Sequence, residues 1–139
     1  YVLNYLQPCA LPAPYAVELQ GATLHVGLPG QTVTHHMDLV NTGMLSDAYD
    51  LTLGPFVWTT TVGLPFGTAL LPITRTPVLM PRERLPLALH VTIPLTATMR
   101  DFDEVTLTAT SVYSPSRYAA SPQRTVAGDA VYLPLVLRQ

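Results

Sequence analysis

The clearest pattern of apolar and polar positions lies between two turns in the first third of the chain. Pro29-Gly30 favours a turn because proline presets its backbone angle and glycine accepts positive φ, and Asn41-Thr42-Gly43 favours a second one. From residue 33 to residue 40 the side chains alternate, which predicts a half-buried strand. One face carries Val33, His35, Met37 and Leu39, and the other carries Thr34, His36, Asp38 and Val40.

Similar short patterns recur along the rest of the chain. Strands are predicted at Tyr15–Leu19, Thr23–Leu28, Tyr49–Leu53, Phe56–Val62, Ile73–Leu79 (a weak edge strand), Leu85–Ile93, Glu104–Val112 and, once or twice, within Thr125–Leu137. Val62–Pro72 and Ser114–Pro122 are predicted to be irregular loops. Fourteen prolines break helices and keep strands short, and Pro86 and Pro94 are expected near strand ends or at a sheet edge.

These elements predict an all-β fold, namely a two-sheet antiparallel immunoglobulin-like sandwich of seven to nine strands. The Cys…Trp…Cys signature of antibody domains is missing, since the chain has a single cysteine. A jelly roll is the rival architecture, although it usually needs a longer chain. The residues expected to form the core between the sheets are Val33, Met37, Leu39, Leu51, Leu89, Val91 and Leu107.

The composition suits one domain with a substantial core, because 48% of the 139 residues are hydrophobic. The sequence contains no run of about 18 apolar residues, so no membrane-spanning helix is predicted. Charged residues make up 12% of the chain and the net charge is −2, so there is no basic footprint for nucleic acid. The lone Cys9 cannot form an intramolecular disulfide, and nothing near it in sequence would activate its thiol.

The ends of the chain suggest a module of a longer protein. Residues 1–14 are apolar and proline-rich and are interpreted as a linker or lead-in strand, and residues 15–139 as the immunoglobulin-like domain. The chain starts at Tyr1 without methionine or a leader, and only Arg138-Gln139 follow the last apolar strand. We therefore expect a module at the C-terminal end of a large exported protein.

The histidines are the first candidates for chemistry. His35 and His36 point to opposite faces of one strand, so the two neighbours cannot chelate one metal ion together. His35 lies on the apolar face and is interpreted as a hydrogen-bonded core histidine. His36, His25 and His90 could meet across a sheet face, which would make a zinc or copper site the alternative.

Acidic and nucleophilic residues offer little more. Asp101-Phe102-Asp103-Glu104 and the pair Asp47 and Asp50 are interpreted as solvated turns, because neither has the spacing of a calcium loop; a structural calcium ion is the alternative. No Gly-x-Ser-x-Gly motif and no phosphate-binding glycine loop is present. We therefore expect no catalytic residue, no cofactor and no metal.

The aromatic residues could form a carbohydrate-binding face if they were exposed. Tyr49 and Trp58 are assigned to the core. Tyr113 and Tyr118 flank the loop Ser114-Pro115-Ser116-Arg117 and are the candidates for exposure, and hence for ligand binding.

Several turns and strands together resemble one family. Pro29-Gly30, the alternating strand, Asn41-Thr42-Gly43 and Asp47-Ala48-Tyr49-Asp50-Leu51 are similar to bacterial immunoglobulin-like or fibronectin-III-like accessory modules of secreted and cell-surface proteins. The resemblance covers about residues 28–114, and it includes an apolar strand ending in Ile93-Pro94. Such modules occur beside subtilisin-like proteases and glycoside hydrolases. The final Val131–Arg138 resembles the tails of large secreted proteins of filamentous phototrophic bacteria.

The resemblance implies a non-catalytic spacer, interaction or surface-attachment domain of an exported bacterial protein such as a protease, located outside the cell or on its surface. Its partners would be other domains of the parent protein and a cell-envelope component or polysaccharide. The alternative is a carbohydrate- or cell-wall-binding module that uses exposed aromatics. A third hypothesis, a small enzyme, would require a cleft that holds a base and a nucleophile.

Overall fold

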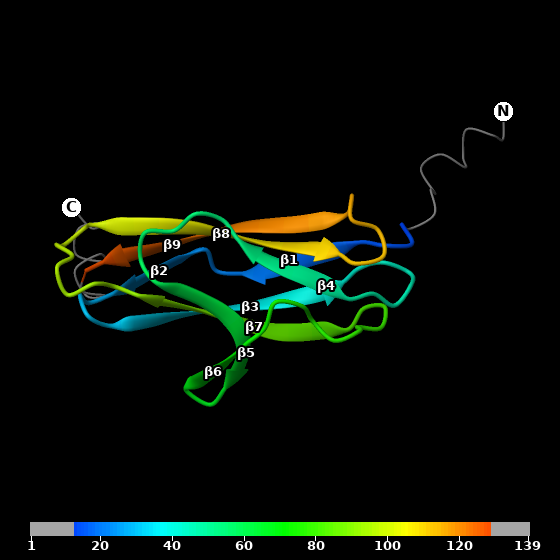
Figure 1. Ribbon diagram of the computed structural model, residues 1–139, viewed down its shortest axis with the longest axis horizontal. Coiled ribbons are helices and arrows are strands. Elements are labelled where there is room, and N and C mark those ends of the chain that lie inside the picture. Colours follow the sequence, from blue (N-terminus) through cyan, green and yellow to red (C-terminus); the bar gives the residue numbers. More distant parts are fainter. Residues whose placement is uncertain (1–12, 129–139) are drawn as a thin grey trace, which may run out of the picture.

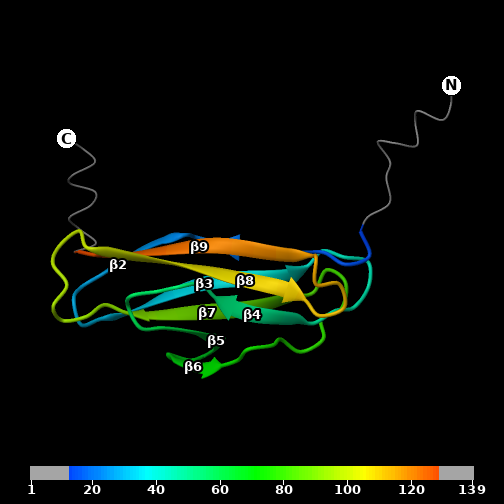
Figure 2. The ribbon, with the colours of Figure 1, turned by 45° about the horizontal axis from the view of Figure 1, so that its top comes forward.

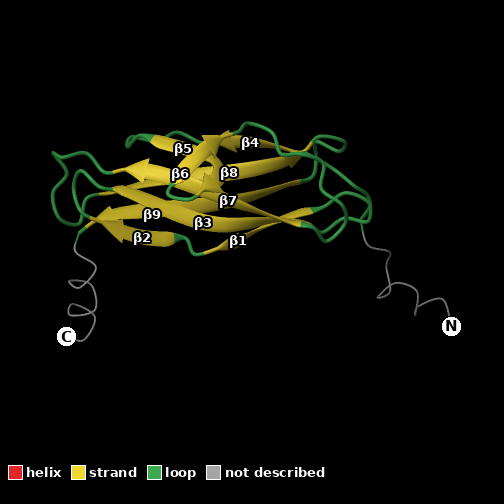
Figure 3. Ribbon diagram, turned by 90° about the horizontal axis from the view of Figure 1, so that it is seen from below, coloured by secondary structure: helices red, strands yellow, loops and turns green. Residues whose placement is uncertain are grey.

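The computed structural model describes residues 13–128, and this part of the chain consists of β-strands and their connections (Figure 3). The predictions for Cys9, for the lead-in at residues 1–12 and for the last strand beyond residue 128 lie outside the described residues. The strands are β1 (Val17–Gly21), β2 (Leu24–Gly27), β3 (Thr32–Asn41), β4 (Tyr49–Leu53), β5 (Thr60–Phe66), β6 (Ala69–Pro72), β7 (Arg84–Thr92), β8 (Phe102–Ser111) and β9 (Tyr118–Ala127).

The strands form the two layers of an immunoglobulin-like sandwich, which confirms the predicted fold (Figure 1). The five-stranded sheet has the order β1-β3-β7-β5-β6, and the four-stranded sheet has the order β2-β9-β8-β4. One pairing differs from the antiparallel expectation, because β2 runs parallel to β9. The chain changes sheets between Gly21 and Leu24 without reversing, so β2 keeps the direction of β1 and lies beside a strand that runs the same way.

The core is formed by the residues that the alternation of apolar and polar positions predicted. All seven residues predicted for the core are at most 7% exposed, and Leu39, Leu89 and Leu107 are fully buried. Tyr49 and Trp58 are buried as well, as expected. These side chains come from both sheets and form one continuous cluster.

The predicted loop at Val62–Pro72 is wrong, because these residues form most of the β5–β6 hairpin. The turn consists of Gly67 and Thr68, with Gly67 at φ 63°, which matches the two-residue hairpin turns that start with glycine. The prolines at 65 and 72 concealed this signal. Neither breaks the hairpin, because the missing N–H of each faces away from the partner strand.

Three other predicted boundaries are also corrected. The strand expected at Phe56–Val62 starts only at Thr60, since the N–H groups of Val57 and Trp58 turn to donate to the Asp103 carboxylate. The loop expected at Ser114–Pro122 ends early, because β9 begins at Tyr118. The weak edge strand at Ile73–Leu79 is reduced to two isolated bridges, Asp50 with Arg75 and Asp47 with Leu79.

The described chain enters the sandwich at one end and leaves it at the other (Figure 2). At the entry end, the Met44 N–H donates to the Pro14 carbonyl at 3.0 Å. At the exit end, the Gly128 N–H donates to the Gly27 carbonyl at 2.7 Å. Neighbouring parts of a longer chain would therefore attach at opposite poles.

Candidate functional site

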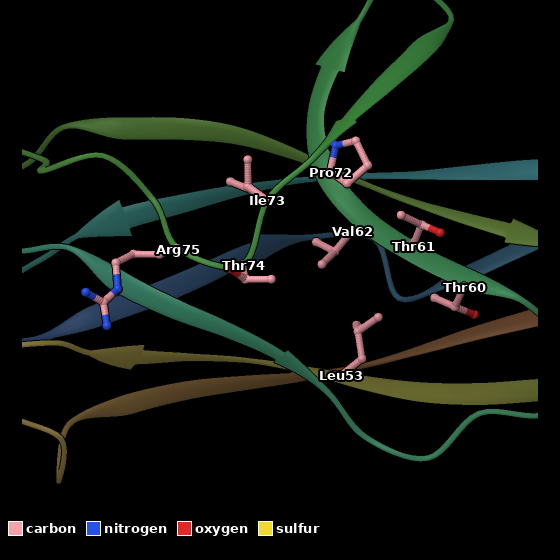
Figure 4. Close-up of a pocket in the computed structure, with 8 residues that line it drawn as sticks. All are labelled: Leu53, Thr60, Thr61, Val62, Pro72, Ile73, Thr74 and Arg75. Atoms are coloured by element: carbon pink, nitrogen blue, oxygen red, sulfur yellow. The ribbon is translucent and has the colours of Figure 1, made fainter.

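A cleft opens on the side of the sandwich where the two sheets come apart, and we call it the side cleft. Its volume is about 530 Å³. Figure 4 shows Leu53 of β4 and Val62 of β5 pointing into the space between the two strands. The residues that line the side cleft are Leu53, Thr60, Thr61, Val62, Pro72, Ile73, Thr74 and Arg75.

The side cleft exists because the chain crosses between the sheets at this point. After β6, the Ile73 N–H still donates to Val62 of the five-stranded sheet, at 3.3 Å. One residue later, the Thr74 carbonyl accepts from Leu51 of the four-stranded sheet, at 2.8 Å. This crossing segment, at Ile73 and Thr74, closes one end of the opening between the sheet edges. The rest of the opening stays open beside Leu53.

Beyond Gly63, β5 no longer pairs with β7, and the hairpin projects from the sandwich (Figure 1). We call residues 64–71 the β5–β6 ribbon. Its apolar side chains are largely uncovered, with Phe66 77% exposed and Leu71 58% exposed. A shallow hollow of about 280 Å³ lies among Phe66, Leu70 and Leu71 at its tip.

Glycine is required at the point where the ribbon departs. A Cβ atom on Gly63 would lie 2.1 Å from the Leu71 carbonyl oxygen, much closer than atoms tolerate. Gly63 therefore allows the β6 backbone to lie directly against β5.

Charge is confined to one end of the side cleft. The Arg75 guanidinium donates to both carboxylate oxygens of Asp50, at 2.6 and 3.2 Å, and these hydrogen bonds lower the pKa of Asp50. Both side chains are exposed, so the pair adds little to stability. Residues 51–74 carry no charged side chain at all.

A second groove, of about 360 Å³, lies on the outer face of the five-stranded sheet at the base of the same hairpin. Its walls are rich in hydroxyl groups, and Thr32 and Thr92 share a hydrogen bond of 3.1 Å across β3 and β7. The polar side chains around it are Thr32, Thr59, Thr61, Thr68, His90 and Thr92.

His35 is the buried core histidine that the sequence predicted. Its Nδ1–H donates to Gln123 Oε1 at 2.9 Å, and its Nε2 accepts from the Thr125 hydroxyl at 2.8 Å. Burial lowers the pKa of His35 to about 4, although the bond to Gln123 opposes the shift. The imidazole is therefore neutral at physiological pH and joins β3 to β9 across the core.

The three histidines considered for a metal site do not come together. His25 packs against His35 with ring centroids 4.0 Å apart, whereas His36 and His90 lie on the outer face of the five-stranded sheet. Burial, and then repulsion from His36, lower the pKa of His25. Within residues 13–128, no group of three or more histidine, cysteine, aspartate or glutamate side chains could hold a metal ion.

Of the residues expected to form a solvated acidic turn at 101–104, only Asp101 lies outside a strand, because β8 begins at Phe102. Asp101 accepts from the Thr98 N–H at 2.8 Å. Asp47 is not a solvated turn residue as expected, because it is fully buried and accepts from the Ser111 hydroxyl and the Ala48 N–H. This buried carboxylate fixes the turn after β8 to the start of β4.

Tyr113 and Tyr118 are 60% and 64% exposed, as expected. They do not form one platform in the described part of the chain. The Tyr113 ring lies beside Tyr15, with centroids 6.1 Å apart, and Tyr118 lies on the outer face of the four-stranded sheet next to Thr110. Their role in binding stays a prediction.

Sequence reasoning missed the side cleft and the ribbon. Two signals were present: the uncharged run at residues 51–74, and Gly67-Thr68 between two apolar segments. The cleft itself could not be found from sequence, because it depends on where the chain crosses between the sheets.

These features define the class of the protein as an immunoglobulin-like β-sandwich domain with an open side. A scan against protein-family models found no match, and a search of curated proteins found no similar sequence. Within the described residues, no helix is long and apolar enough to cross a membrane.

Solved structures with the same fold come from unrelated settings. A family 123 glycoside hydrolase from Clostridium perfringens matches with a TM-score of 0.54 and 9% identity, over 83% of this chain and 27% of that chain. The SrpA adhesin of Streptococcus sanguinis matches with a TM-score of 0.51 and 9% identity, over 86% and 61%. The seventh PapD-like domain of human CEP192 matches with a TM-score of 0.50 and 12% identity, over 87% and 92%. At these identities the likeness establishes the fold alone.

Proposed function

We propose that this domain is a non-catalytic accessory module, a spacer, interaction or surface-attachment domain, of a larger exported bacterial protein. The observation that carries the proposal is the path of the chain, which enters at one pole of a well-packed sandwich and leaves at the other. Such a path holds flanking parts of a chain apart at a fixed distance. Domains of this fold within an adhesin and a glycoside hydrolase support the proposal.

The test is to delete residues 15–139 from the parent protein and to measure two properties separately. We expect turnover of a small substrate by any catalytic domain to be unchanged, and retention at the cell envelope to fall. If turnover collapses while the remaining domains stay folded, the module takes part in the active site and the proposal is wrong.

A carbohydrate- or cell-wall-binding module is the second candidate, because Tyr113 and Tyr118 are exposed aromatic rings. Pull-down of the domain on insoluble cell-wall polysaccharide would test this function. Binding that is lost in Tyr113→Ala and Tyr118→Ala, but kept in Phe56→Ala as an aromatic control, would support it. Equal retention of all three variants would exclude it.

A further inference from the structure

The four-stranded sheet stops one strand short of the sheet it covers, and the geometry points to what fills that position. We infer that the side cleft takes an extended, uncharged polypeptide segment, which pairs with β4 at Leu53 and covers the β5–β6 ribbon. This inference rests on the proposed role as an interaction module and names the chemistry of the partner.

The backbone of β4 supplies the pairing groups. In an antiparallel strand, successive residues direct their N–H and C=O groups to opposite edges. The Leu51 N–H points away from β8, because it bonds to Thr74, so the N–H and C=O of Leu53 point the same way. The crossing segment turns to the other sheet at Ile73, and within residues 13–128 no backbone partner is found for Leu53 at this edge.

The ribbon supplies the apolar surface. Val62 is buried against the core, and the side chains two and four residues further along β5 lie on the same face. Leu64 is only half-buried and Phe66 is 77% exposed, because no strand of the other sheet reaches over them. Phe66 and Leu71 therefore present a core-type surface that lacks its cover.

The other nearby edges cannot accept a strand equally well. Pairing of β5 with β7 stops after Gly63 and Ala88, and the next hydrogen-bonded pair would join Pro65 to Pro86, neither of which has an N–H. On the outer edge of β6, Pro72 likewise lacks a donor. Prolines at edges block strand addition, so the β4 edge at Leu53 remains.

The charge pattern selects the partner. Residues 51–74 are uncharged, and Asp50 and Arg75 at the end of the side cleft satisfy one another. A charged segment placed over Phe66 and Leu71 would lose its hydration without gaining a counter-ion. A lipid tail has no hydrogen-bonding groups, and sugar hydroxyls lack the regular spacing of a strand, whereas an extended peptide presents N–H and C=O groups in the register that Leu53 needs.

The test selects peptides that bind the full chain. A random dodecapeptide phage library is panned on the protein, with counter-selection on the double variant Phe66→Glu/Leu71→Glu. Both substituted side chains are exposed, and Val57→Glu/Leu95→Glu, at positions 85% and 84% exposed, is the matched control. We expect discriminating clones that are uncharged over at least four residues. Their synthetic peptides should bind about tenfold or more weakly to the ribbon variant and normally to the control.

A second measurement locates the pairing. Adding the selected peptide to isotope-labelled protein should shift the Leu53 amide resonance in NMR spectra, and a peptide with N-methylated backbone should bind poorly. The inference fails if no clone discriminates, if discriminating clones are charged, or if N-methylation has no effect. Concentration-dependent dimers abolished by Phe66→Glu/Leu71→Glu, without peptide binding, would assign the side cleft to a second copy instead. None of these outcomes decides whether the domain is an accessory module, because that proposal is tested separately by retention at the cell envelope.

Discussion

At the scale of single residues, His35 shows how a polar side chain can be part of a core. Its two ring nitrogens are both satisfied, by Gln123 and Thr125, so burial leaves no unpaired polar atom on the ring. The cost falls on the protonated form, which would place a charge between the sheets beside the His25 ring. Neutral His35 holds β3 to β9 only above the pH at which it titrates.

We predict that this arrangement makes the domain sensitive to mild acid. The pKa of His35 is about 4 in the folded protein and about 6.5 when unfolded, so the unfolded state binds the proton first as the pH falls. Above pH 6.5 the contribution of neutral His35 to the free energy of unfolding is complete. As the pH falls from about 6.5 to 4, the free energy of unfolding decreases by about 3 kcal/mol in total. Urea titrations across this range measure the effect.

The control for this prediction is a histidine on the outer face of the five-stranded sheet that does not contact His25 or His35. In His90→Gln the dependence on pH should match that of the wild type. In His35→Gln it should flatten, although overall stability will fall because Gln123 and Thr125 lose their partner. An unchanged slope in His35→Gln would show that other groups cause the acid sensitivity.

The apolar core makes a second residue-scale prediction. Leu39 and Leu89 are completely buried in the same core cluster, so truncation of either to alanine should lower the free energy of unfolding by about 2–5 kcal/mol. Leu95→Ala, at a position 84% exposed, should change it by less than about 0.5 kcal/mol. Denaturant titrations in which all three variants behave alike would contradict the assigned core.

At the scale of elements, the strand prolines follow a common rule. Pro86 lies within β7 where β5 no longer pairs, and Pro122 lies within β9 before the residues that pair with β2. Together with Pro65 and Pro72, they occupy positions whose N–H would face an edge without a neighbour. The positions of Pro65, Pro86 and Pro122 therefore coincide with the points where the β5–β7 and β2–β9 ladders stop.

We predict that removing one facing pair of prolines would extend the ladder. In Pro65→Val/Pro86→Val, both positions regain an N–H that can join β5 to β7 beyond Gly63. Hydrogen exchange should show protected amides at positions 65 and 86, and the ribbon should lie closer to the sheet. Pro94→Val, outside any strand, is the control. Fast exchange at both positions would mean that Gly63, rather than the prolines, directs the ribbon.

The same rule explains which elements the sequence predicted. Alternation identified β3, β7 and β8, because one face of each is buried and no proline lies in the buried register. The hairpin of β5 and β6 was missed because its prolines resemble loop residues when read without the partner strand. The exposure of Tyr113 and Tyr118 followed from the turn between them. The side cleft could not be predicted from local sequence patterns, since it forms between segments that meet only in the folded protein.

At the scale of the whole molecule, the two poles carry exposed apolar side chains. Met44 and Met80 are exposed near the entry pole, and Val57 and Leu95 near the exit pole. A module with neighbours at both ends would cover such residues without using its sides. In that arrangement the side cleft would stay free for the peptide segment proposed above.

The parallel pairing of β2 and β9 has a mechanical consequence. A force that pulls the two flanking segments apart draws β2 towards the entry pole and β9 towards the exit pole. The two pulls act in opposite senses along the axis that the parallel strands share. The hydrogen bonds of this ladder, such as those from Arg124 to Thr23 and from Gly128 to Gly27, are then sheared together rather than opened one after another. Shear shares the load among all of them, so the domain should extend abruptly at a high force instead of peeling at a low one.

Single-molecule pulling through both ends would measure this resistance. The Val126 N–H faces β2, because Arg124 and Gly128 on either side donate to Thr23, just before β2, and to Gly27 at its end. Val126→Pro should therefore lower the rupture force, whereas Val126→Thr should leave it nearly unchanged. Equal forces for both variants would place the mechanical clamp elsewhere. If the domain is a module of a surface protein, as proposed, such a clamp would keep it folded while flowing liquid or a moving surface puts the chain under tension.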